Sequence, residues 1–172
     1  RGSKDADLGD LENAAKEIAT FEEELVYRGF KKYIEGIEKS SEHEQVALGN
    51  EPDTILKTIG EQVKSMQKDG VGGPFTLVVN DRLWSSLSTI SKGYPLIKQL
   101  KQIIDGQIIV NFISDNSYLV TEREGDYELT LGQDMSIGYD YHDAREVKLY
   151  FTESFTFRVH SPEAIRVLVQ NK

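Results

Sequence analysis

Apolar residues recur at spacings of three and four in four stretches of the first two thirds of the chain, the pattern of helices with one buried face. These stretches predict helices at about 10–28, 52–69, 81–90 and 95–104. Asp10 is the expected N-cap of the first helix and Gly29 its stop. Pro52 and Pro95 suit the first turns of the second and fourth.

The pattern changes to strands from residue 107 onward. Apolar or alternating runs predict strands at 108–112, 118–121 and 127–131 and a long strand from about 147, in addition to a buried strand at 75–79 and a short one at 46–48. In the long strand the apolar residues share one face, which we expect to be buried. Glu153 interrupts that face and indicates a bulge, a strand edge or a paired carboxylate. Helices mixed with antiparallel strands in this order predict an α+β fold.

Charge and composition narrow the possible partners. The 172 residues include 29 Asp and Glu against 20 Lys and Arg and no Cys, and the net charge is −9. The electric field of so negative a chain repels the phosphate backbone of nucleic acids, so we expect no nucleic acid as a partner. No apolar run approaches the roughly 20 residues that span a bilayer, so we expect no membrane partner either. Because the chain begins at Arg1, we expect it to be part of a longer protein.

Residue types that carry catalysis or bind metals are sparse and scattered. The three histidines, His43, His142 and His160, lie far apart in the sequence and are interpreted as surface or structural residues. The run 22–24 of three glutamates could supply metal ligands, but it has no Glu-x-x-His partner, so a solvated or inter-subunit helix face is favoured. The glycine-rich run 70–73 is interpreted as a turn and Trp84 as a core residue rather than a stacking platform. We therefore predict no catalytic residues, no metal site and no enzyme activity.

Five blocks carry a resemblance to a known family. They are FEEELVYRG at 21–29, DG at 69–70 followed by GPFTLVVN at 73–80, GYPL at 93–96, LGQDMSIGY at 131–139 and TESFTF at 152–157. In this order and at these gaps they resemble the encapsulins, linocin-like shell proteins of prokaryotic nanocompartments, over about residues 7–168. The resemblance implies the fold of tailed-phage major capsid proteins, which have a peripheral domain with a spine helix and an axial domain near the symmetry axes. It places 1–51 in the peripheral domain, 52–126 in the axial domain and 127–172 in the peripheral domain again.

The function implied by this resemblance is mechanical. Many copies of such a subunit form an icosahedral shell in the cytoplasm that encloses a cargo protein, such as a ferritin-like protein or a peroxidase, held by a targeting peptide. The resemblance assigns Ser91, Lys92, Gly93 and Tyr94 to the loop around a fivefold pore, where Lys92 would favour small anions. As a plain interpretation, the same residues form an interhelix turn.

The resemblance also assigns cargo docking to the segment with Gln133, Asp134, Met135 and Ile137, in which Met135 and Ile137 are alternatively core residues of a strand and turn. About the first third of an encapsulin has no counterpart in this sequence. Since flavin-binding members use an aromatic residue from that third, the resemblance carries no flavin site over to this sequence, and the residues present predict no cofactor. The competing interpretation is a truncated capsid-like domain that acts as a small binding or regulatory module.

Overall fold

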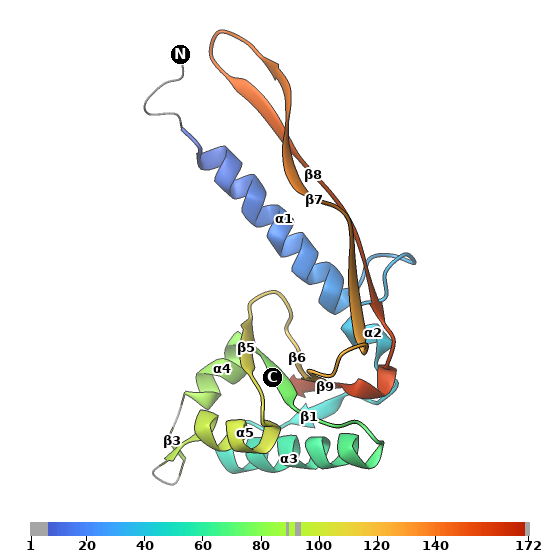
Figure 1. The fold of residues 1–172 in the computed structure, drawn as a ribbon. Coiled ribbons are helices and arrows are strands. Elements are labelled where there is room, and N and C mark those ends of the chain that lie inside the picture. Colours follow the sequence, from blue (N-terminus) through green and yellow to red (C-terminus); the bar gives the residue numbers. More distant parts are fainter. Residues whose placement is uncertain (1–6, 89, 92–93, 171–172) are drawn as a thin grey trace.

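The computed structural model describes residues 7–88, 90–91 and 94–170 and divides them into a compact base and a long arm (Figure 1). The arm consists of helix α1 (Gly9–Arg28) and the hairpin of β7 (Tyr127–His142) and β8 (Val147–Val159). The remaining elements are α2 (Ile37–Ser40), β1 (Val46–Leu48), α3 (Pro52–Lys68), β2 (Phe75–Asn80), α4 (Asp81–Leu87), β3 (Ile90–Ser91), β4 (Tyr94–Pro95), α5 (Leu96–Ile104), β5 (Ile108–Asn111), β6 (Ser117–Thr121), the 3₁₀ turn Pro162–Ala164 and β9 (Ile165–Gln170).

The base is built on a five-stranded mixed sheet with strand order β1-β9-β6-β2-β5. The pairs β1–β9 and β2–β5 are parallel, and β6 is antiparallel to both of its neighbours. Every residue of β2 is buried. The reason is that Leu77 and Val79 pack in the cluster with α3, α4 and α5, while Val78 packs in a second cluster with Leu25 of α1 and Phe157 of β8. The arm therefore covers the sheet face that the three helices leave free.

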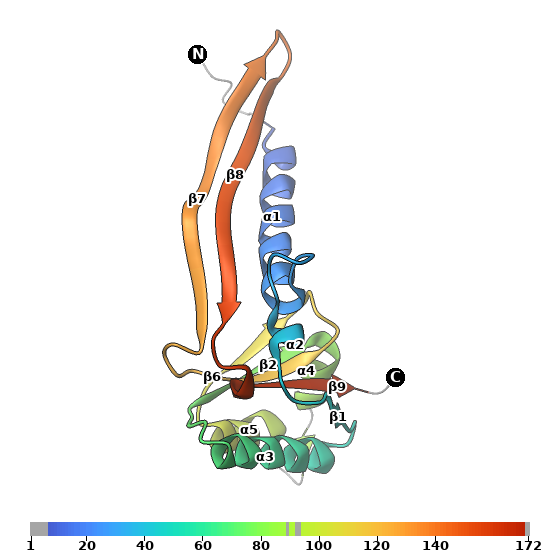
Figure 2. The same cartoon turned by 90° about the vertical axis from the view of Figure 1, so that its right-hand side faces the viewer.

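The arm extends away from the base, with α1 alongside the hairpin in both views (Figures 1 and 2). Burial along β8 falls steeply from the base outward: Phe157 is 7% exposed, whereas Leu149 is 40% and Val147 61% exposed. The expectation of a buried apolar face on this strand is thus wrong for its outer half. The alternation of residues shows that one face of β8 is apolar, but it does not show whether other residues cover that face. Among the described residues, the face is covered only near the base.

Other predicted elements are confirmed with adjusted ends. Helix α1 begins at Gly9 rather than at an Asp10 cap, and the Gly9 amide donates to Asp7 Oδ1 (3.0 Å). The short helix α2 was not predicted, and α4 ends at Leu87, before the predicted end at 90. Pro95 lies in β4, immediately before α5, instead of inside the helix.

The predicted domain ranges divide the sheet of the base. Strands β1 and β9 fall in ranges assigned to the peripheral domain, yet they pair with each other, and β9 pairs with β6 of the predicted axial range. Strand β9 was not among the strands predicted from periodicity. A strand with both faces covered lacks the alternation on which that prediction depends, and five of the six residues of β9 are buried.

Two buried polar clusters fix the base and its junction with the arm. The hydroxyl of Tyr118, which is fully buried, lies 2.5 Å from Ser114 Oγ and donates to Glu38 Oε1 (2.5 Å), and its ring stacks on Tyr27 of α1 (centroids 5.0 Å apart). In β9, the guanidinium of Arg166 donates to Asp69 Oδ2 (2.7 Å) at the end of α3. Burial lowers the pKa of Arg166, and Asp69 opposes this shift.

Candidate functional site

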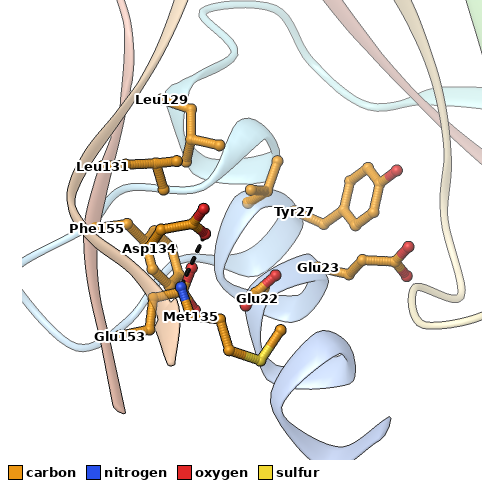
Figure 3. A pocket seen from close by; sticks show the side chains of 10 residues that line it. Glu22, Glu23, Tyr27, Leu129, Leu131, Asp134, Met135, Glu153 and Phe155 are labelled. Atoms are coloured by element: carbon orange, nitrogen blue, oxygen red, sulfur yellow. Dashed lines mark hydrogen bonds between the residues drawn. The ribbon is translucent and has the colours of Figure 1, made fainter. Parts of the chain in front are cut away.

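A pocket of about 380 Å³ lies between α1 and the hairpin of the arm (Figure 3). Its apolar lining consists of Val26, Leu129, Leu131, Met135 and Phe155, with Tyr27 beside them. Its charged lining is entirely acidic and consists of Glu22, Glu23, Asp134 and Glu153. A pocket with apolar walls and a few charged groups suits a short peptide with apolar side chains better than a strongly polar ligand.

A bulge in β7 brings the acidic and apolar groups together. Leu131 pairs with Phe155 and Ser136 pairs with Thr152, so the four residues 132–135 of β7 lie opposite the two residues 153–154 of β8. The extra residues place Asp134 and Met135 opposite Glu153, on the side that faces α1. All three explanations offered for Glu153 hold here: β8 is an edge strand of a two-stranded sheet, a bulge lies opposite Glu153, and its carboxyl group interacts with that of Glu22.

The carboxyl group of Glu153 has an unusual environment. Its pKa is raised to about 7, first by a hydrogen bond with Glu22, then by desolvation and by the charges of Glu22 and Asp134. Atom Oε1 of Glu22 is buried, and no donor of the described chain reaches it. Asp134 differs, because its Oδ1 accepts a hydrogen bond from the backbone amide of Met135 (2.8 Å). Burial, followed by the charge of Glu23, raises the pKa of Tyr27.

The structure separates the residues predicted to dock cargo. Asp134 and Met135 line the pocket, whereas Gln133 and Ile137 do not; Gln133 Nε2 donates instead to Ser136 Oγ (3.0 Å), and Ile137 is exposed. The alternative that Met135 and Ile137 are core residues is wrong, since both are exposed within one chain. The remaining lining residues were not predicted as site residues. Signals for three of them were present: Glu153 is the carboxylate on the apolar face of β8, and Glu22 and Glu23 belong to the glutamate run of α1.

The glutamates of α1 have separate roles. Glu22 and Glu23 both line the pocket, but Glu23 is exposed, as predicted for a solvated face, whereas Glu22 is half-buried. Glu24 accepts a hydrogen bond from Arg28 (3.2 Å). Trp84 packs against the core, as predicted.

The histidines are confirmed as separate residues with local partners: His160 Nε2 lies 2.9 Å from Glu128 Oε2, and His142 Nδ1 lies 2.5 Å from the Tyr139 hydroxyl. Across the described ranges, no three His, Asp or Glu side chains are grouped so that they could hold a metal.

The predicted pore loop is described only at its two ends. Ser91 pairs with Tyr94 in the two-stranded ladder of β3 and β4, and Lys92 and Gly93 lie outside the described residues. The ladder lies at the end of the base farthest from the arm (Figure 1). In the described ranges there is no helix both long enough and apolar enough for a membrane span.

Comparison with known proteins identifies the family. Residues 1–156 match the sequence profile of the Linocin_M18 family, described as encapsulating protein for peroxidase. The chain belongs to the encapsulin family. It is 37% identical over 167 residues to the type 1 encapsulin shell protein of Rhodococcus erythropolis and 34% identical over 166 residues to that of Mycobacterium tuberculosis. These alignments cover 96% and 95% of this chain but 63% of each relative, so this encapsulin chain spans about three fifths of their length.

Solved structures place this encapsulin chain among the capsid folds. A virus-like particle from Pyrococcus furiosus matches with a TM-score of 0.75 and 22% identity over 94% of this chain and 68% of that chain. The capsid of Myoviridae phage XM1 matches with a TM-score of 0.69 and 12% identity over 96% of this chain and 66% of that chain. The predicted α+β fold of tailed-phage major capsid proteins is therefore confirmed.

Proposed function

We propose that this chain is a structural subunit that assembles with many copies of itself into a closed shell in the cytoplasm and encloses a cargo protein. Its family and its capsid fold support this role. The observation that carries the proposal is the uncovered arm. Along its outer half, side chains such as Ile137, Tyr139 and Leu149 are at least 40% exposed. A soluble monomer rarely keeps so continuous an apolar surface, which fits packing against neighbouring copies.

The test of assembly is particle size. Light scattering and negative-stain electron microscopy of the purified chain should show megadalton particles, whereas a free module of 19.5 kDa would stay small. Leu149→Asp places a charge on the apolar face of the arm and should leave small species. Thr152→Asp introduces the same charge on the opposite, polar face and should still assemble. Dispersed wild-type molecules at every concentration would contradict the proposal.

The pocket of the arm is the proposed docking site for the cargo peptide. Met135, Leu131 and Phe155 offer apolar contacts to a peptide, and Asp134 offers a charge for a basic residue. A peroxidase, the cargo in the family's description, or a ferritin-like protein is the class of cargo that we propose. Met135→Asp should abolish co-purification of cargo while particles still form. Thr130→Asp, on the other face of β7 and outside the lining, should retain the cargo; loss of cargo in this variant alone would place docking elsewhere on the arm.

The loop between β3 and β4 is the proposed lining of a pore. In a fivefold arrangement, Lys92 of each copy would contribute to a ring of positive charge in an otherwise acidic wall. Lys92→Glu particles should therefore admit small anions more slowly and metal cations faster than wild-type particles. Equal uptake rates in stopped-flow measurements would exclude this loop as the entry route.

A further inference from the structure

The docking pocket holds two carboxyl groups on facing walls. Glu22 of α1 and Glu153 of β8 both line the pocket, and Figure 3 shows the two side chains converging from opposite walls; the interaction with Glu22 is the first cause of the raised pKa of Glu153. An ionised carboxylate only accepts hydrogen bonds. A hydrogen bond between two carboxyl groups therefore requires that one of them carries a proton, and this proton also provides the donor that the buried Oε1 of Glu22 otherwise lacks.

Within the described part of the chain, the pocket lining offers the pair no compensating positive charge. The charged groups that line the pocket are Glu22 and Glu23 on α1, Asp134 on β7 and Glu153 on β8, and none of the lining residues is Lys, Arg or His. Two ionised carboxylates in contact repel each other strongly, and Asp134 adds to this repulsion. The empty pocket thus lowers its charge by retaining one proton, whereas an entering cation would compensate the charge directly.

We propose that Glu22 and Glu153 share one proton in the empty pocket and release it to the solvent when a cationic side chain of the docked peptide enters, so that docking is coupled to proton release. This inference rests on the docking function proposed above. The partner that it specifies is a peptide segment with a Lys or Arg side chain between apolar side chains. The cation would lie between the two carboxylates, and the apolar side chains would contact the walls formed by Leu131 and Phe155.

The sign of the pH dependence follows from the protonated state. Since the pKa of Glu153 is about 7, the pair keeps its proton at pH 6 and has mostly lost it at pH 8. A cationic peptide should therefore bind about eight- to tenfold more tightly at pH 8 than at pH 6, because the deprotonated fraction rises from about a tenth to about nine tenths. At pH 7, where half of the pockets carry the proton, binding should release about half a proton per site.

One experiment tests the shared proton without any peptide. Infrared difference spectra of wild-type protein against Glu153→Gln should show a protonated-carboxyl band at pH 6 that disappears by pH 8. Glu17→Gln, an exposed glutamate of α1 outside the pocket, is the matched control and should leave this band in place. A wild-type spectrum without the band at pH 6 would overturn the inference, and it would leave the docking function intact.

A second experiment tests the coupling. The probes are acetyl-Ser-Leu-Lys-Leu-Ser-amide and the same peptide with norleucine in place of lysine, titrated calorimetrically in two buffers of different ionisation enthalpy. Tighter binding of the lysine peptide at pH 8, with proton release that is lost in Glu153→Gln, supports the proposal. Binding of both peptides without pH dependence refutes the coupling alone. If neither peptide binds at either pH, the docking function fails as well.

Discussion

The hydroxyl of Tyr118 offers a sharp test of the buried polar cluster in the base, beside the point where α1 packs. Its substitution by Phe keeps the ring that stacks on Tyr27 and removes only the hydroxyl, which donates to Glu38 and contacts Ser114. A buried hydrogen bond to a charged acceptor contributes about 1.5–3 kcal/mol. We expect Tyr118→Phe to lower the free energy of unfolding by about 2 kcal/mol, or Tm by roughly 4–8 °C for a chain of this size.

The matched control is the same substitution at Tyr127. Its hydroxyl donates to the backbone carbonyl of Ala164 (2.8 Å), a neutral acceptor, so its loss should cost only about 1 kcal/mol. Both variants are measured by denaturant titration at one protein concentration, because assembly shifts apparent stability. If Tyr118→Phe destabilises no more than Tyr127→Phe, the charged acceptor Glu38 does not contribute as argued.

Three further outcomes are expected. Gly36→Ala should destabilise by about 3 kcal/mol in thermal melts, because its Cβ would lie 2.3 Å from the nitrogen of Gly29, whereas Gly72→Ala, with no atom within 4 Å of its Cβ, should be neutral. Arg166→Met removes a buried charge and its hydrogen bonds together and should cost less than Arg166→Ala, which also leaves a cavity; equal losses in urea titrations would contradict this. The protonated carboxyl group of Glu153, whose pKa is raised, contributes a stabilisation that is fully present below about pH 4.5 and is lost as pH rises through about 7. The free energy of unfolding of the wild type should therefore fall over this range relative to that of Glu153→Gln. Parallel pH profiles of the two proteins would disprove this expectation.

The sequence predicted the parts of the fold that local signals encode. The apolar periodicity of α1 and α3, Gly29 with its positive φ of 79°, and the punctuated run of β2 each mark an element without reference to the rest of the chain. The outer part of β7 was missed because its Gly, Asp and Ser residues have weak strand propensity and its bulges disrupt the alternation. Its strand state depends on pairing with β8.

Only those parts of the candidate site that have a local sequence signal were predicted. Asp134 and Met135 stand in the most distinctive sequence block, and Glu153 was conspicuous as a charge on an apolar face. Their meeting with Glu22 required the docking of α1 against the hairpin, a contact between positions about 130 residues apart that no local pattern reports. The resemblance identified the segment of β7 that contains Asp134 and Met135, and only the three-dimensional structure identified α1 as the opposite wall of the pocket.

The sheet pairing of β6 with β9 has a consequence for how this chain can change. Val120 is aligned with Ile165, so the polypeptide leaves the sheet to build the hairpin and re-enters it at the neighbouring position. A hairpin whose two ends lie side by side in the sheet can become longer or shorter, or be replaced, without a change in the order of the flanking strands β6 and β9. Changes in the hairpin alone can therefore alter the length of the arm and the curvature of an assembled shell during evolution. The helices and the sheet of the base stay unchanged.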